Sequence, residues 1–170
     1  MFKKIVIIAL VSTLAAGCAS VPMESLERTT TAKQFDPPSD GMAGLYIYRN
    51  TFYGGAAYTD VMVDGYCIGS SAPYVFFYEE VEGDKTHKVS SGDTTTFGDQ
   101  ICRNCLLIKV KSGMHYFIKQ NMAFWDVGVE LVDEEQGKEE VSKLDMAAQG
   151  TCRPRSTFGD ELHNIQSIGS

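Results

Sequence analysis

Two short β-type runs joined by Asp64-Gly65 constrain the fold more than any other part of this sequence. A two-residue hairpin turn of type I′ needs a positive φ at both central positions, which favours Asp-Gly. The runs on either side, residues 61–63 and 66–68, therefore predict a tight antiparallel hairpin. Pairing across this turn places Val61, Val63, Tyr66 and Ile68 on one face of the sheet and Met62 and Cys67 on the other.

Six further segments have the composition of β-strands, and turn residues such as Ser112-Gly113 separate them. The run 74–78 is continuously apolar and aromatic, which indicates a strand buried on both faces. Together with the hairpin, the pattern predicts a mostly β fold, namely a small antiparallel β-sandwich of about eight strands. The six segments are residues 43–49, 74–78, 86–90, 106–110, 115–120 and 127–132.

One short C-terminal helix is expected after the last strand. Asp133 can cap it, and Gln136 follows three residues later as in a capping box. Gly137 weakens the first turn. A narrow apolar stripe along this segment can lie on the sandwich; its members are Val141, Leu144 and Ala148.

The chain divides into four segments by composition. Residues 1–17 are predicted to be a lipoprotein signal peptide, 18–40 a lipidated flexible linker, 41–149 the β-sandwich domain and 150–170 a C-terminal tail. About 22 flexible residues would span roughly 25 Å on average and about 70 Å when fully extended. The tail carries few large apolar side chains, so we expect it to fray or to be disordered.

The N-terminal segment indicates where the protein resides. Lys3 and Lys4 precede an apolar run, residues 5–16, that is shorter than the roughly 20 residues needed to span a bilayer. The run ends in Leu-Ala-Ala-Gly-Cys, which resembles the lipobox of bacterial lipoproteins. The resemblance implies cleavage between Gly17 and Cys18 and acyl chains on Cys18. The alternative is an ordinary secretory signal that happens to contain a cysteine.

Lipidation and charge define the expected surroundings. Two or three acyl chains would hold the protein at a membrane, since each buried methylene contributes about 0.8 kcal/mol. Ala19 in place of Asp after the cysteine implies, in Gram-negative lipoproteins, an outer-membrane location facing the periplasm. Removal of residues 1–17 takes away two lysines and no acid, so the formal charge falls from −7 to −9. That charge opposes nucleic-acid binding, and the expected partners are the membrane and an unidentified envelope protein.

The order of motifs also resembles a known family. The residues are Pro37-Pro38, Gly41, Ala43-Gly44-Leu45-Tyr46-Ile47-Tyr48-Arg49, Val63-Asp64-Gly65, Ile68-Gly69, Pro73, Phe76-Phe77-Tyr78, His87-Lys88-Val89, Gly113, Tyr116-Phe117-Ile118 and Glu130-Leu131-Val132. This set resembles the bacterial lipoproteins grouped as domain of unknown function 2846, over residues 33–146. The Val-Asp-Gly, Ile-Gly and Pro arrangement is also similar to small β-sandwich domains of the PEGA type. The resemblance implies the fold and the lipid anchor and no reaction.

Four cysteines remain after Cys18, and an oxidising compartment favours disulfides among them. Four cysteines allow three pairings, so the connectivity stays open. One or two bridges that pin a turn and the C-terminal tail are expected. Cys102 and Cys105 have redox spacing, but a strand-like run follows them where a redox motif has a helix. The four cysteines are Cys67, Cys102, Cys105 and Cys152.

No catalytic or metal-binding constellation is visible, so we expect no catalytic residue, no metal and no cofactor. His87, His115 and His163 lack metal-ligand spacing, and His87 is expected to be a structural histidine. The adjacent acids point to different sides of a strand or helix, which indicates a solvated acidic surface. These acids are Glu79-Glu80, Glu134-Glu135 and Glu139-Glu140.

Three functions remain open. We expect a lipid-anchored, non-catalytic binding or accessory module, for which the loop 51–55 with Phe52 and Tyr53 could be a contact site or could pack over the sandwich. A thiol-dependent envelope enzyme would use Cys102 with Cys105, or Cys152 with a histidine base. A structural lipoprotein that stabilises an envelope complex is the third possibility.

Overall fold

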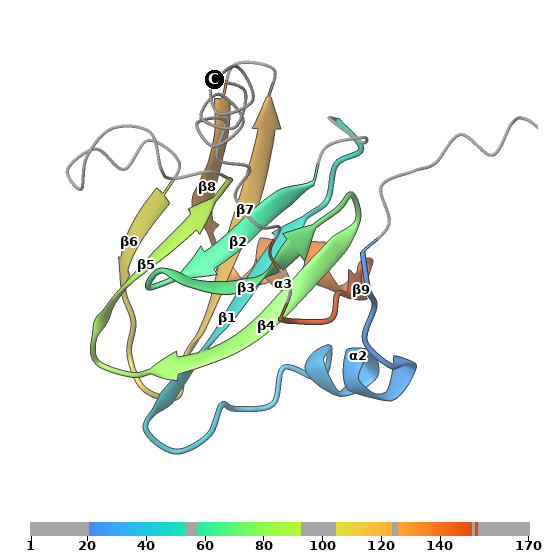
Figure 1. Cartoon of the computed structure of the whole chain (residues 1–170). Helices are drawn as coiled ribbons and strands as arrows, with labels where there is room; N and C mark the ends of the chain where they lie inside the picture. Colours follow the sequence, from blue (N-terminus) through green and yellow to red (C-terminus); the bar gives the residue numbers. More distant parts are fainter. Residues whose placement is uncertain (1–20, 54–57, 93–104, 124–125, 151, 153–170) are drawn as a thin grey trace, which may run out of the picture.

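The chain folds as two stacked β-sheets with helices on one outer face (Figure 1). The structure is a computed structural model and describes residues 21–53, 58–92, 105–123, 126–150 and 152. The strands of the described residues are β1 (Met42–Arg49), β2 (Thr59–Val63), β3 (Tyr66–Ser71), β4 (Val75–Glu82), β5 (Thr86–Ser91), β6 (Cys105–Lys109), β7 (His115–Ala123), β8 (Asp126–Val132) and β9 (Asp145–Met146). The helices are α2 (Leu26–Ala32) and α3 (Glu134–Ser142).

The larger sheet has the order β8-β7-β1-β4-β9 and the smaller sheet the order β3-β2-β5-β6. The predicted mostly β sandwich with a short C-terminal helix is confirmed. Most pairings are antiparallel, but β1 runs parallel to β7, and β4 runs parallel to β9. The larger sheet is therefore mixed, with β1 at its centre.

The space between the sheets is filled mainly by aliphatic side chains. Leu45 and Ile47 of β1 are fully buried there, as is Phe77 of β4. Val61 and Val89 close this core from the smaller sheet. Alternate residues of each strand point inward because successive side chains of a strand face opposite sides.

The predicted hairpin forms at Asp64-Gly65, where φ is 51° and 85°. Val61, Val63 and Ile68 are buried as expected. Tyr66 pairs with Val63 across the turn, as predicted, but it is 77% exposed. Tyr66 is exposed because the first pair of the hairpin lies beside the turn. A register shift between Val61 and Met62 pairs Val61 with Gly69.

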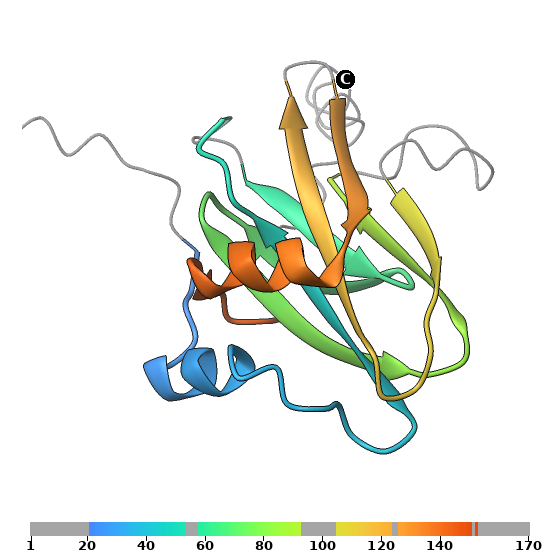
Figure 2. The ribbon, with the colours of Figure 1, turned by 180° about the vertical axis from the view of Figure 1, so that it is seen from behind.

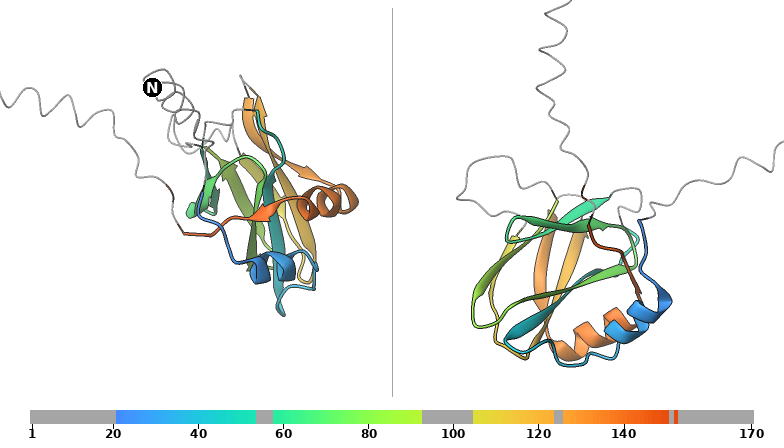
Figure 3. Two further views of the ribbon diagram at one scale, coloured as in Figure 1. Left: turned by 90° about the vertical axis from the view of Figure 1, so that its right-hand side faces the viewer. Right: turned by 60° about the horizontal axis from the view of Figure 1, so that its bottom comes forward.

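The outer face of the larger sheet is covered by α3, with α2 beside it (Figure 2). The turned view in Figure 3 (left) shows α3 outside the larger sheet. Asp133 caps α3 as predicted, because its side chain accepts a hydrogen bond from the Gln136 N–H at 2.9 Å. Gly137 is buried against β7, and a Cβ at this position would lie 2.1 Å from Cγ of Phe117. The glycine therefore lets the helix approach the sheet closely, at a cost in helix propensity.

Residues 21–40 differ from the predicted flexible linker. They contain α2, whose N-cap Ser25 accepts a hydrogen bond from the Arg28 N–H at 3.2 Å. The hydroxyl of Tyr46, a residue of β1, donates to the Ala32 carbonyl at 2.7 Å. The physical reason is that backbone groups of this segment pair with residues 146–148, a long-range contact that the composition of the segment does not indicate.

The chain after β9 stays close to the smaller sheet. The Gly150 N–H donates to the Ile68 carbonyl at 2.8 Å. Cys152 is the last described residue, and the predicted disorder of the remaining tail concerns residues 153–170, outside the described part.

Candidate functional site

A cleft of about 450 Å³ lies where α3 passes the end of β1 and the start of β4. We call it the α3 cleft. Arg49 pairs with Val75, so the residues just beyond this pair, Asn50 and Tyr74, lie at the same edge. The lining residues are Asn50, Tyr74, Gln136, Glu139, Glu140, Lys143 and Leu144.

Tyr74 has an unusual backbone conformation at the rim of this cleft. Its φ is 62°, in the left-handed region that costs a bulky residue about 1–2 kcal/mol. Phe35 has a similar φ of 55°, but its ring packs edge-on against Tyr46 with centroids 5.2 Å apart. Tyr74 is 52% exposed, so burial offsets less of the cost of its backbone conformation. Backbone strain of this kind concentrates at functional sites.

A hydrogen-bonded network forms one wall of the cleft. The buried Tyr48 hydroxyl donates to Oε2 of Glu140 at 2.6 Å. The other carboxylate oxygen of Glu140 accepts from Nζ of Lys119 at 3.3 Å and from Nε2 of Gln136 at 3.1 Å. A carboxylate with three donors is held rigidly and presents a fixed acceptor to the cleft.

The network shifts the pKa of its members. Burial raises the pKa of Tyr48 well above its ordinary value, and the neighbouring Glu140 raises it further. Burial also tends to raise the pKa of Glu140, but the hydrogen bonds from Tyr48, Gln136 and Lys119 outweigh it and lower that pKa. Tyr48 therefore stays protonated and Glu140 ionised near neutral pH, so the hydroxyl remains a donor and the carboxylate an acceptor.

Two more exposed aromatic residues follow Asn50 in the chain. Phe52 is 57% and Tyr53 54% exposed, so less than half of each residue is covered. Nη2 of the fully buried Arg49 donates to the Tyr53 carbonyl at 2.8 Å. Burial lowers the pKa of Arg49. Gly54 and Gly55 of the predicted contact loop lie outside the described residues.

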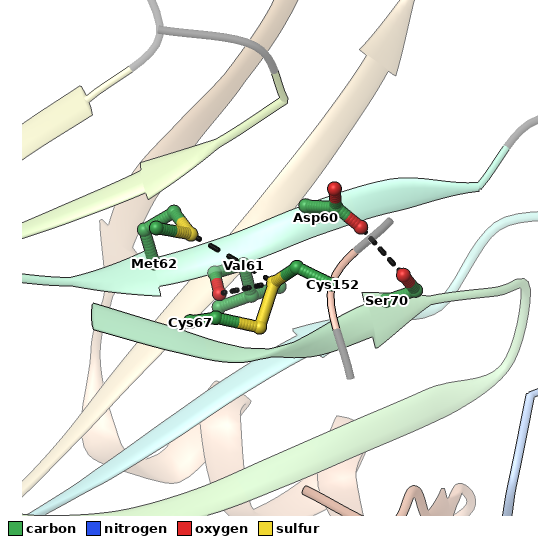
Figure 4. The surroundings of a disulfide bond; sticks show 6 residues. All are labelled: Asp60, Val61, Met62, Cys67, Ser70 and Cys152. Atoms are coloured by element: carbon green, nitrogen blue, oxygen red, sulfur yellow. Dashed lines mark hydrogen bonds between the residues drawn. A yellow bond between two sulfur atoms is a disulfide. The ribbon is translucent and has the colours of Figure 1, made fainter. Parts of the chain in front are cut away.

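The cysteines are joined as disulfides in the described part of the chain. Cys67 of β3 and Cys152 form a bridge with Cα atoms 5.9 Å apart (Figure 4). Beside it, the Ser70 hydroxyl donates to Asp60 at 2.5 Å. Cys105 is also disulfide-bonded. The predicted bridge to the tail is confirmed, whereas Gly17, Cys18 and Cys102 lie outside the described residues.

His87 is confirmed as a structural histidine. Its Nδ1 lies 2.6 Å from Oδ2 of Asp64, and its Nε2 lies 2.8 Å from the Glu82 carbonyl. Burial lowers the pKa of His87, but the hydrogen bonds to Asp64 and Glu82 dominate and raise it. The pair fixes the hairpin turn against β5.

The other predicted candidates do not converge. His115 lies on β7 beside Tyr46, and burial, followed by the charge of Lys138, lowers its pKa. His163 lies outside the described residues. Across the described ranges, no group of three or more His, Cys, Asp or Glu side chains could hold a metal ion.

The adjacent acids do not all form the solvated surface that was predicted. Glu134, Glu135 and Glu139 are exposed, whereas Glu79, Glu80 and Glu140 are half-buried. Glu79 accepts from Gln149, and Glu80 accepts from Tyr78. Glu139 pairs with the exposed Lys143 at 2.7 Å. Glu140 differs from Glu139 because α3 turns it toward Tyr48. Sequence reasoning missed this residue, since its helical neighbour has the same chemistry and only the helix orientation distinguishes the two.

Comparison with known proteins places these residues in a family. The model of a family described as "Protein of unknown function (DUF2846)" matches residues 39–130. The chain belongs to the DUF2846 family. An uncharacterized protein of Haemophilus influenzae (strain Rd) is 43% identical over 141 residues, which cover 81% of this chain and 80% of that protein. No solved structure matches the chain.

The DUF2846 match covers only part of the candidate site. It includes Asn50 and Tyr74, whereas α3 lies beyond residue 130. The α3 cleft thus combines residues inside the DUF2846 match with a helix outside it. In the part of the chain that the structure describes, none of the helices has the length and apolar character to cross a membrane.

Proposed function

We propose that the protein is a lipid-anchored component of the bacterial cell envelope that binds another envelope component at the α3 cleft, without catalysis. The observation that carries the binding proposal is Tyr74, an exposed ring on a left-handed backbone at the mouth of the cleft. Exposed aromatic side chains at a rigid edge are typical of contact sites.

The lipid anchor is supported by the N-terminal sequence. The run that ends in Gly17-Cys18 places small residues and a cysteine where lipoprotein processing requires them. Ala19 supports an outer-membrane address with the folded domain in the periplasm. The Cys18→Ala chain should fail to incorporate palmitate and should fractionate as a soluble protein. Unchanged membrane fractionation of this variant would contradict the anchor.

The lining of the cleft indicates the chemistry of the partner. The carboxylates of Glu139 and Glu140 provide acceptors, and Lys143 provides one cation. The Tyr74 ring and Leu144 add an apolar surface. A protein segment that offers an apolar side chain next to hydrogen-bond donors fits this lining.

Site-specific crosslinking tests the binding site. A photoreactive p-benzoylphenylalanine in place of Tyr74 should form an adduct with one envelope protein in living cells. The same group in place of Tyr66, which is 77% exposed on the other sheet, is the matched control. The adduct at position 74 should disappear when Lys143→Glu changes the opposite wall. Equal adducts at both positions, or an adduct insensitive to Lys143→Glu, would contradict the proposal.

The thiol-dependent alternative makes the opposite prediction about the cysteines. Cys152 is bonded to Cys67, and Cys105 is also in a disulfide, so a thiol enzyme would first require their reduction. Maleimide labelling of the native periplasmic protein should find no free thiol. A thiol that labels without reductant would favour the enzyme and would argue against a purely binding role.

A further inference from the structure

The segment that follows the proposed lipidation site is fixed to the folded body. The Glu24 N–H donates to the Met146 carbonyl at 2.9 Å, and the Ala148 N–H donates to the Pro22 carbonyl at 2.8 Å. Val21 packs against the inner core, and Thr29 of α2 is buried. The first described residue is therefore already part of the domain.

The distance between anchor and body is consequently short. Three residue steps separate Cys18 from Val21, and an extended chain advances at most about 3.6 Å per residue, or roughly 11 Å in total. With acyl chains on Cys18, the body cannot stand off the bilayer as a 22-residue linker would allow. This step rests on the lipid anchor proposed above.

The surface next to this attachment carries exposed apolar side chains. Leu26 is 81% exposed and Met23 is 46% exposed. Both lie within eight residues of Cys18, and Pro22 beside them is exposed as well. Side chains of this kind insert at the boundary between headgroups and acyl chains, about 5–10 Å deep.

The charge of the segment also fits a membrane. Residues 21–35 contain two acids, Glu24 and Glu27, and two bases, Arg28 and Lys33. The segment is therefore neutral, although the chain after residue 17 carries a formal charge of −9. All of the excess negative charge lies elsewhere, where anionic lipid headgroups would repel it.

We infer that the protein lies directly against the bilayer that holds its acyl chains, with α2 as the contact and Met23 and Leu26 at the lipid boundary. In Figure 1, α2 and β6 lie on opposite sides of the molecule. The view of Figure 3 (right) agrees. The β6 edge, with Leu107, therefore points away from the membrane.

Tryptophan quenching by brominated lipids tests this orientation. The acylated full chain is reconstituted into vesicles of phosphatidylethanolamine and phosphatidylglycerol with brominated acyl chains. Leu26→Trp is the probe, and Leu107→Trp, at a side chain 67% exposed on β6, is the matched control. The parent chain has Trp125 as its only tryptophan and supplies the background. We expect about a twofold loss of the added fluorescence at position 26, since bromines occupy the depth of interfacial side chains, and no loss at position 107.

Vesicle flotation distinguishes a failure of the proposed lipid anchor from a failure of the proposed orientation. A chain that does not float lacks the anchor, which overturns both the anchor and the orientation. A chain that floats while positions 26 and 107 are quenched equally, or not at all, overturns the orientation alone. Met23→Trp is a second probe, for which we expect the same quenching as at position 26.

Discussion

The two faces of the larger sheet differ in how they pack, one against the smaller sheet and the other against the helices. The inner face presents the aliphatic Leu45 and Ile47 to the smaller sheet. The outer face presents Tyr46 and Tyr48, whose rings are buried and whose hydroxyls reach Ala32 and Glu140 on the helical side. Alternation along β1 supplies both faces. Sheet-on-sheet packing here depends on shape and apolar area, whereas the helices are additionally oriented by directional hydrogen bonds.

The largest expected effect tests the inner face. Phe77→Ala should destabilise the protein by about 3–5 kcal/mol, because a fully buried ring leaves a cavity between rigid sheets. Urea unfolding measures the change. Phe52→Ala, at a side chain 57% exposed, should change stability by less than about 0.5 kcal/mol. Similar losses for the two variants would mean that the inner face is not the main source of stability.

The next largest effect tests how closely α3 approaches the outer face of the larger sheet. Helix propensity alone predicts that Gly137→Ala stabilises α3 by about 1 kcal/mol. A Cβ here would lie 2.1 Å from Cγ and 2.3 Å from Cβ of Phe117, so we expect a net loss of about 2–3 kcal/mol. Thermal unfolding decides the sign. Glu135→Ala, exposed on the same helix, is the control and should be near neutral.

A smaller effect isolates the directional hydrogen bond. Tyr48→Phe keeps the buried ring and removes the donor to Glu140, which should cost about 1.5 kcal/mol because the acceptor is charged. Urea unfolding measures the loss, with Tyr66→Phe on the exposed hairpin as the control. If both variants are equally stable, the hydroxyl does not hold the helix.

The smallest effect is a dependence on pH. Because the folded pKa of Glu140 is lowered below 4.5, its contribution is present above that value and is lost as the pH falls through the folded pKa. Acid should therefore reduce amide exchange protection in α3 before it reduces protection in β1. Tyr48→Phe should weaken this difference. Simultaneous loss of protection in α3 and β1 would argue that the two layers open as one unit.

The sequence predicted the two β-sheets better than the helices that cover the larger sheet. Period-two alternation and the Asp64-Gly65 turn are local signals, so the eight longer strands and the hairpin are confirmed. The two residues of β9 are too short to form a pattern. Alternation also leaves the partner of a strand undetermined, which is why the parallel pairing of β1 with β7 was not predicted.

The candidate site and the N-terminal segment depended on long-range contacts. Tyr48 and Glu140 are 92 residues apart, so their contact has no local signal. The N-terminal helix did have weak signals, namely Ser25 as an N-cap and the Glu24–Arg28 pair at 2.7 Å. Its threonines and the nearby prolines favoured a linker, because the pairing partners at residues 146–148 are remote in sequence.

The Cys67–Cys152 bridge spans 85 residues and encloses most of the sheet strands. A single backbone cleavage anywhere inside that interval, for example at the exposed turn around Asp84, would produce two polypeptides that remain covalently joined. Such a nicked molecule would migrate as one species until reductant is added. A cut in a surface loop between Cys67 and Cys152 would therefore not release the carboxyl-terminal fragment.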